Sequence, residues 1–306
     1  MPIELNPEQR RQAIEIMQNY LTAPPNADGR TIVEVEADLN NNRVAVIESE
    51  LEPLLVAYLA GDLALSDFKT KVDGINKRNR FWGFNGTKGQ MFFNLVLNVA
   101  EDAEECDQAV KSAIEMPLSD EIASTRIKTF SSYVKGIGDS HVQSGGTKQS
   151  KPNLSSVPFF LSYFWQIQKR DVWPIYYTNS VNVMNDLNLW QPSGDLAADY
   201  ITYKGFHDEL VRVFTAESGK KFSLYDVEHV FWFHGGKSQL ITKPIPKEGS
   251  LEGTPNEEKS QDDAREISPI QRLPESYIPP IVAILPNIAR NEPQLREAAK
   301  GIWHQP

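Results

Sequence analysis

Hydrophobic positions along most of the chain recur every three or four residues, which is the spacing of one face of an α-helix. In the first such segment, Ile14 and Met17 follow this spacing. Asn6 is a favourable N-cap and Pro7 suits the first helical position. The pattern therefore predicts a helix over residues 6–21.

Further helices are expected along the chain, and two segments differ from the rest. Residues 31–38 alternate apolar and charged side chains, which is the pattern of a short strand. Residues 223–236 carry so many apolar side chains that a helix and a strand both remain open. The other expected helices cover residues 43–61, closed by a C′ glycine at Gly61, 66–79, as a short helix with a basic loop, 91–116, 119–134, 157–168 and 206–219.

The character of the sequence changes at residue 243. Residues 243–272 contain almost no large apolar side chain and carry net negative charge, which is typical of a segment that does not order itself. Residues 273–306 regain apolar periodicity. We therefore expect a mainly α fold with a small β component. It would comprise a helical recognition domain over 1–242, with a division into 1–65 and 66–242 as one option, then a disordered linker and a terminal helix.

Two basic segments stand out in a chain of net charge −10. Residues 69–88 hold six basic side chains and one acidic, and residues 126–151 hold five basic and one acidic. Local positive charge on an acidic molecule is typical of one anion-binding face rather than of general attraction to polyanions. We expect the two segments to meet in space and form a single positive surface.

Residues 81–94 add a glycine-rich stretch to the first basic segment. Three glycines surround Lys88 just before an apolar helix, and backbone amides at a helix N-terminus can bind a phosphate. The spacing is not that of a P-loop. A glycine-rich turn beneath an aromatic cluster is the alternative interpretation.

The second basic segment contains the sequence KGIGD, with Gly136 and Gly138, between two expected helical stretches. This pattern resembles the turn of a helix-hairpin-helix DNA-binding element, in which backbone amides meet a DNA phosphate. An ordinary turn between helices is the alternative interpretation.

The most aromatic part of the chain covers residues 156–181. Such a run is typical of a hydrophobic core, whereas base stacking would require one or two exposed rings. Its layout is similar to that of glycosylase-like helical modules, but Tyr177 or Thr178 stands where those enzymes carry a catalytic aspartate. Because neither side chain stabilises a developing sugar cation as a carboxylate does, base excision is disfavoured.

Metal and redox chemistry find little support in the sequence. Cys106 is the single cysteine, which excludes intramolecular disulfides and thiolate zinc sites. The five histidines show no metal-ligand spacing, and no nuclease motif of the D/E-x-K type lies on an expected pair of strands. Glu228, His229 and Lys237 could be grouped as a catalytic set, but no motif supports that grouping, and a catalytic role for them is disfavoured. We expect no cofactor or metal in this chain, with Mg²⁺ required only if a cleavage domain is present.

Two blocks of sequence resemble parts of known protein families. The segments FWGFNGTKGQMFFN, VPFFLSYFWQIQKRDVWPIYYTNSV and YDVEHVFWF, within residues 66–235, resemble the N-terminal regions of prokaryotic restriction and defence proteins. The later segment LPESYIPPIVAILPNIARNEP is similar to the helical lead-in of a FokI-type cleavage domain, which Pro274, Tyr277, Ile278 and residues 289–291 match. This resemblance implies a front part that recognises DNA and a rear part that cuts it with Mg²⁺ and carboxylates. Since only 15 residues follow the match, we do not expect cleavage chemistry in this chain.

The favoured function is DNA recognition for a restriction-type endonuclease of an antiviral defence system. Double-stranded DNA is the expected partner, with a nuclease subunit or a second copy of the chain as further partners. No apolar run of about 18 residues and no apolar signal core occur, so we expect a cytoplasmic protein without a membrane partner. Phosphate contacts are expected from Lys69, Lys71, Lys77, Arg78, Arg80, Lys88, Arg126, Lys128, Lys135, Gly136, Gly138, Lys148 and Lys151. The candidates for base reading are Asn85, Gln90, Gln143 and Asn153, because amide side chains pair with adenine edges.

Two other functions remain open. One is a protein–protein interaction module of a defence system, in which the aromatic block docks a partner and Trp82 or Trp165 carries the contact. The other is a complete Mg²⁺-dependent nuclease with an unrecognised centre.

Overall fold

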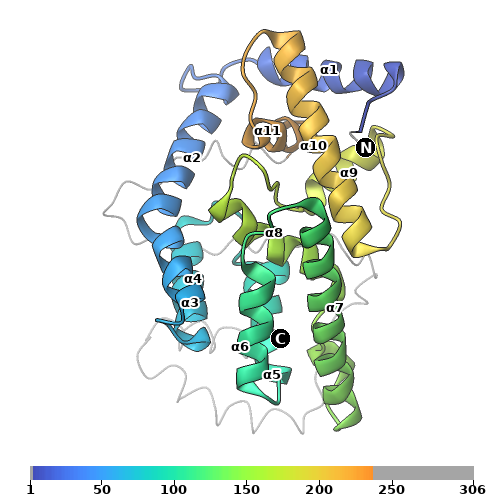
Figure 1. The fold of residues 1–306 in the computed structure, drawn as a ribbon. Coiled ribbons are helices and arrows are strands. Elements are labelled where there is room, and N and C mark those ends of the chain that lie inside the picture. The colour runs from blue at the N-terminus through green and yellow to red at the C-terminus, as the bar shows by residue number, and fades with distance from the viewer. Residues whose placement is uncertain (1–2, 237–306) are drawn as a thin grey trace, which may run out of the picture. The chain divides into compact units, whose positions relative to one another are not determined.

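A computed structural model of the chain describes residues 3–236. All of them belong to one contact unit, residues 1–245, which shows no division near residue 65. In Figure 1, α2 lies along one side, α7 and α10 along the other, and α8 between them. The helices are α1 (Pro7–Leu21), α2 (Ile32–Val46), α3 (Glu52–Ala60), α4 (Leu65–Asn79), α5 (Phe92–Val99), α6 (Ala103–Ile114), α7 (Asp120–Gln143), α8 (Val157–Gln168), α9 (Thr178–Asp186), α10 (Leu196–Ser218) and α11 (Leu224–His234). Two short π-helices, η1 (Ile47–Leu51) and η2 (Thr87–Met91), and two 3₁₀ turns, η3 (Lys148–Ser150) and η4 (Leu154–Ser156), join them.

Helix α8 forms the centre of the hydrophobic core. Every side chain from Val157 to Ile167 is buried. A helix that is apolar on nearly all sides is stable only when other elements cover it all round. Around Phe160, the ring centroids of Phe93 and Phe130 lie at 5.0 and 5.9 Å. The core interpretation of the aromatic segment is confirmed.

Local start and stop signals act as the sequence predicts. The Asn6 side chain caps α1 by accepting hydrogen bonds from the amides of Glu8 and Gln9, and the Gln9 side chain accepts one from the Asn6 amide. Ser119 caps α7 through the amide three residues later. Gly61 ends α3 with a φ of 88°, a left-handed conformation that glycine adopts without steric cost.

Residues 32–38 belong to α2 and Thr31 is its N-cap, so the strand predicted over 31–38 is wrong. The Thr31 hydroxyl accepts a hydrogen bond from the Glu34 amide, and the Glu34 carboxylate accepts one from the Thr31 amide. This capping box starts a helix and overrides the short alternating pattern. The buried residues of α2 are Glu36 and Arg43, which is unusual for a helix packed on a core.

Helix α7 runs without a break through the segment expected to form a turn. Gly136 and Gly138 lie inside this helix, so the helix-hairpin-helix interpretation is wrong. A Cβ at position 138 would lie 2.8 Å from Cγ of Lys151, so this glycine lets the Lys151 side chain pack against the helix. The chain turns later, at Gly145, where φ is 95°.

Residues 91–116, expected as one helix, form two. Asp102 caps α6 by accepting hydrogen bonds from the amides of Glu104 and Glu105, and this cap separates α6 from α5. The segment near the end of the described chain, for which a helix and a strand were both open, is helix α11.

The fold is mainly helical, as expected, but residues 3–236 contain no strand, so the small β component is absent from that part. None of the helices described there is long and apolar enough to cross a membrane. The expected linker (243–272), the expected terminal helix (273–306) and Lys237 lie outside the described residues.

Candidate nucleic-acid interface

The two basic segments lie on different sides of the molecule. Helix α4 carries most of the first segment and packs against α3 and η1. Helix α7 carries most of the second and packs against α5, α6, α8 and α10. Figure 1 shows α4 beside α3 on one side and α7 on the other, with α6 between them. The single positive surface expected from the sequence is therefore not formed.

Within the first segment, the cations differ in how they are paired. Lys69 forms an ion pair with Asp73 at 2.6 Å, and both side chains are largely covered. Arg78 forms an exposed ion pair with Glu50. The exposed cations Lys71, Lys77 and Arg80 form no ion pair with any described residue.

The position of these cations also has a structural explanation. Lys77 and Arg78 lie in the last turn of α4, where cations interact favourably with the negative end of the helix dipole. Arg80 follows as the C-cap, with a φ of 54°. Positive charge at this end of the helix thus stabilises α4 and is also available at the surface.

In the second segment, the chain's own carboxylates neutralise most of the cations. Arg126 pairs with Glu115 at 2.6 Å. Asp139 holds Lys135 at 2.7 Å and also pairs with Lys151. Hydrogen bonds from these two lysines lower the pKa of Asp139 to about 2, so its carboxylate stays charged over the whole neutral range.

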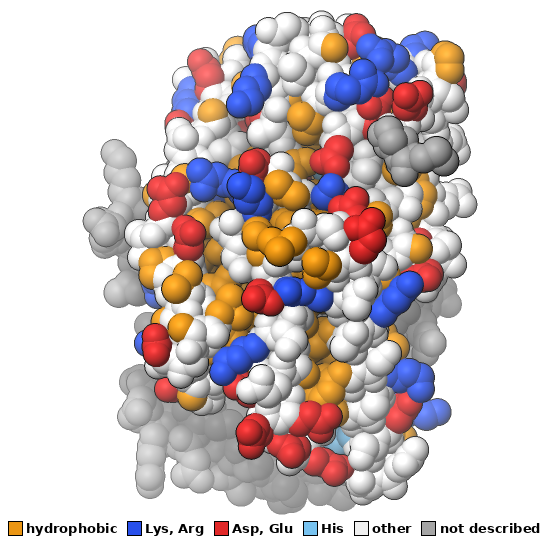
Figure 2. All heavy atoms as spheres, in the orientation of Figure 1, with side chains coloured by type: hydrophobic (Ala, Val, Ile, Leu, Met, Phe, Trp, Pro, Cys, Tyr) orange, Lys and Arg blue, Asp and Glu red, His pale blue; other side chains and the backbone are white. Residues whose placement is uncertain are grey.

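Two cations of the second segment remain exposed without an ion pair. Lys128 is exposed on α7 and contributes to lowering the pKa of Asp195, after the backbone hydrogen bonds from Ala198 and Ala197. Lys148 is exposed in η3. Figure 2 shows basic and acidic side chains interspersed over the face it displays, with carboxylates gathered at the end where α6 begins. That face presents no continuous positive surface.

The glycine-rich stretch is a tight structural turn. Gly89 is buried, and a Cβ there would lie 2.1 Å from the Phe84 carbonyl oxygen. That same oxygen accepts a hydrogen bond from the Gln90 amide at 2.6 Å. Lys88 donates from Nζ to Oγ1 of Thr178 at 2.7 Å and is half-buried. These contacts favour the glycine-rich turn over a phosphate cradle.

The four amide side chains proposed for base reading lie on separate elements. Asn85 is exposed before η2, and the half-buried Gln90 lies within η2. Gln143 is exposed at the end of α7. Asn153 is exposed, but its side chain accepts a hydrogen bond from the Ser155 amide. The structure does not bring these side chains together.

The two tryptophans considered for partner docking, and Trp173 of the aromatic block, are inaccessible to a ligand. Trp82 and Trp165 are 1% and 0% exposed, and Trp173 is 2% exposed. Neither base stacking nor partner docking can use rings at this depth. The more exposed apolar side chains lie elsewhere, with Leu118 in the α6–α7 loop 81% exposed.

A group of polar residues, which we call the buried seam and which is fully buried except for the half-buried Asn40, joins α2 to α8 and α11. It consists of Glu36, Asn40, Arg43, Gln166, Glu228 and His229. Arg43 Nη1 lies 3.3 Å from Glu228 Oε2, and Gln166 Nε2 donates to the other Glu228 oxygen at 3.0 Å. His229 Nε2 lies 2.8 Å from Asn40 Oδ1, and its Nδ1 lies 3.4 Å from Glu36 Oε2.

The seam also reaches the loop after α4. Arg43 Nη2 donates to the carbonyl oxygen of Phe81 at 2.7 Å, and the guanidinium lies 4.9 Å from the ring centroid of Trp232. Burial raises the pKa of Glu228, and the charge of Arg43 opposes that rise. Sequence reasoning considered Glu228 and His229 only as part of a catalytic group, which it disfavoured, and it missed Glu36 and Arg43, because their partners are distant in sequence. Since every charged group of the seam is buried, we interpret the seam as a structural element that holds α2, α8 and α11 together.

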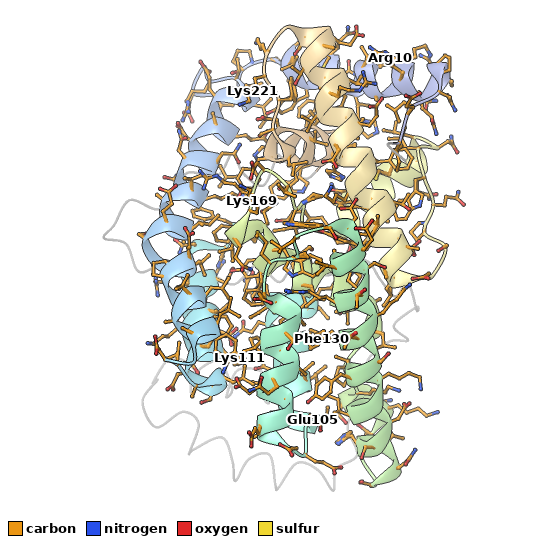
Figure 3. The ribbon with its side chains drawn as sticks, viewed as in Figure 1. Arg10, Glu105, Lys111, Phe130, Lys169 and Lys221 are labelled. Carbon is orange, nitrogen blue, oxygen red and sulfur yellow. The ribbon has the colours of Figure 1, made fainter. Side chains whose placement is uncertain are left out.

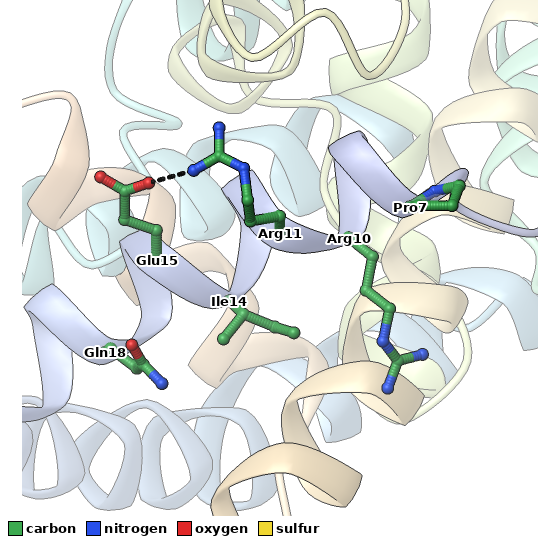
Figure 4. Close-up of a pocket in the computed structure, with 6 residues that line it drawn as sticks. All are labelled: Pro7, Arg10, Arg11, Ile14, Glu15 and Gln18. Carbon is green, nitrogen blue, oxygen red and sulfur yellow. Dashed lines mark hydrogen bonds and ion pairs between the residues drawn. The ribbon is translucent and has the colours of Figure 1, made fainter.

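A shallow hollow on the described surface runs along α1. It is lined by side chains on one side of this helix, where Ile14 lies between charged neighbours (Figure 4). Arg11 pairs there with Glu15 at 3.2 Å, and Arg10 pairs with Glu217 of α10. Among residues 3–236 no group of three His, Cys, Asp or Glu side chains could hold a metal ion.

Comparison with protein-family models, with curated proteins and with solved structures identified no match. The class that the fold and the surface define is therefore a helical module with a small exposed basic region at the end of α4.

Proposed function

We propose that residues 3–236 form a DNA-contacting helical module, the recognition part of a restriction-type defence protein, and that it contacts DNA along the second half of α4, from Lys71 to the C-cap Arg80. One observation carries this proposal: Lys71, Lys77, Arg78 and Arg80 are all exposed on or directly after one helix. Lys71 and Arg78 are seven residues apart, so they lie on the same face, two turns apart. This surface is much smaller than the one the sequence predicted.

The chemistry of the four cations suits phosphate contacts. Three of them form no ion pair with a described carboxylate, so their charge is available to neutralise DNA phosphates. Such contacts release counterions and hold the protein on the duplex without reading its sequence. Cleavage forms no part of the function proposed for these residues.

A charge-matched pair of double variants tests the proposal. Lys71→Ala with Lys77→Ala removes two of the α4 cations. Lys220→Ala with Lys221→Ala removes two exposed lysines of the α10–α11 loop, which also make no ion pair with described residues. Figure 3 labels Lys221 at the end of the molecule where α1 lies. Fluorescence anisotropy with a labelled duplex, and a melting curve for each variant, supply the measurements.

The α4 double variant should lose at least about tenfold in duplex affinity near 0.1 M salt. The control variant should lose much less, because its charge change is equal but remote from the proposed contact. If the two double variants lose the same duplex affinity, the effect depends only on the net charge of the protein, and the proposed contact through α4 is refuted.

A second candidate is a protein-interaction module, which one observation favours. Leu118 is 81% exposed, and Ile122, in the first turn of α7, is 38% exposed. This apolar contact would replace the aromatic block, which is buried. Leu118→Ala should leave duplex binding unchanged if α4 carries the function.

A further inference from the structure

Short helix η1 places two carboxylates beside two arginines from other parts of the chain. Glu48 and Glu50 are two residues apart, so they project from opposite sides of the helix. Glu50 pairs with Arg78 of α4, and Glu48 lies 3.5 Å from Arg170 in the loop after α8. Each carboxylate thus neutralises a cation that would otherwise face solvent.

Arg78 differs from the other exposed cations of α4. Lys71, Lys77 and Arg80 have no carboxylate partner among the described residues, whereas Arg78 has Glu50. The Arg78 side chain is nevertheless 60% exposed and that of Glu50 37% exposed. An ion pair this open to solvent is weak, so another anion can replace the carboxylate.

We propose that Glu50 is an internal competitor for the DNA-contacting surface: it occupies the Arg78 guanidinium in the free protein, and a DNA phosphate takes its place in the complex. This inference rests on the proposed function and concerns how the same surface is regulated. A guanidinium presents its donors as a fork that matches the oxygens of a carboxylate and of a phosphate equally well. The two anions repel each other, so the Glu50 carboxylate disfavours a phosphate at Arg78.

The expected size of the effect follows from the exposure of the pair. Removing the Glu50 charge should raise duplex affinity about two- to fivefold, the range set by exposed ion pairs. Because the gain comes through Arg78, it should vanish when Arg78 is absent. Glu50→Gln in the Arg78→Ala background should therefore bind as Arg78→Ala alone does.

Glu52 offers a matched control. It is exposed, lies two residues from Glu50 at the start of α3, and makes no ion pair with described residues. Glu52→Gln removes the same charge without releasing an arginine. The experiment is a double-mutant cycle with one control. It measures the duplex affinity of the unaltered full chain and of the chain carrying Glu50→Gln, Arg78→Ala, Glu50→Gln/Arg78→Ala or the control Glu52→Gln.

The outcomes separate this inference from the proposed function. A gain for Glu50→Gln that exceeds that for Glu52→Gln, and that disappears with Arg78, supports competition. Equal gains for the two glutamines, a gain that persists without Arg78, or a loss of affinity in Glu50→Gln would overturn it while DNA binding stands. If the unaltered chain does not bind the duplex at low salt, the proposed function itself fails.

Discussion

Arg43 of α2 and Glu228 of α11 form an ion pair in which both side chains are fully buried, with Nη1 3.3 Å from Oε2. The same arginine donates to the Phe81 carbonyl oxygen, so one side chain joins α2, α11 and the loop after α4. This loop follows the proposed DNA-contacting surface directly. The buried seam therefore anchors the loop that follows the proposed DNA-contacting surface.

Breaking the buried pair should destabilise the fold strongly. Glu228→Ala leaves the Arg43 guanidinium buried without its carboxylate, which costs about 3–5 kcal/mol in the free energy of unfolding. Urea unfolding measures the loss, and Glu228→Gln supplies a milder variant if the alanine form does not fold. Arg11→Ala breaks only the exposed pairs with Glu8 and Glu15 and should cost far less, because solvent screens such pairs. Equal costs for the buried and the exposed pair would refute a structural role for the seam.

Stability should depend on pH through His207. Burial lowers the pKa of this imidazole from 6.5 to about 4, and Nδ1 donates to the Tyr203 carbonyl oxygen at 3.0 Å. Between pH 4 and 6.5 the His207 imidazole is protonated in the unfolded chain and neutral in the folded chain. The contribution of His207 to the free energy of unfolding is therefore fully present above pH 6.5. It is lost as pH falls toward 4, and the full effect is about 3 kcal/mol.

The variant His207→Gln isolates this contribution. Its free energy of unfolding should change less than that of the unaltered protein between pH 7 and pH 4, because glutamine does not titrate. An NMR titration that finds an ordinary imidazole pKa for His207 would contradict the assignment.

Two glycines should respond in opposite directions to alanine. A Cβ at Gly136 meets nothing within 4 Å, and the residue lies inside α7, so Gly136→Ala should stabilise by about 0.5–1 kcal/mol. A Cβ at Gly89 would lie 2.1 Å from the Phe84 carbonyl oxygen, so Gly89→Ala should destabilise by about 1–3 kcal/mol. Thermal unfolding of both variants provides the measurement. Destabilisation by Gly136→Ala would instead favour a turn at KGIGD.

Signals within a few residues predicted most of the helices. Buried polar contacts between residues far apart in the sequence could not be predicted in this way. Asn6 and Gly61 mark helix ends through bonds to their own neighbours, so these ends were predictable. Residues 31–38 also carry a local start signal, the Thr31–Glu34 capping box, but the alternating pattern pointed to a strand instead. What no local signal shows is that Glu36 is buried against His229, which is 193 residues away in the sequence. A short alternating pattern cannot reveal such a partner.

The same limit applies to the candidate site. Counting charge within 69–88 and 126–151 found the basic residues but overlooked their partners outside those segments. Glu50 lies 28 residues before Arg78, and Glu115 lies 11 residues before Arg126. Local net charge therefore overestimated the positive surface, because three-dimensional pairing leaves only Lys71, Lys77 and Arg80 of the first segment, and Lys128 and Lys148 of the second, exposed without an ion pair to a described residue.

The salt dependence of duplex binding tests the central claim most directly. For the unaltered full chain, the logarithm of the binding constant should fall with the logarithm of salt concentration with a slope between about −2 and −4, as expected for two to four phosphate contacts. The Lys71→Ala/Lys77→Ala variant should show a slope smaller in magnitude by about 2, and the Lys220→Ala/Lys221→Ala variant an unchanged one. No binding at low salt, or the same slope in all three proteins, would contradict DNA contact through α4.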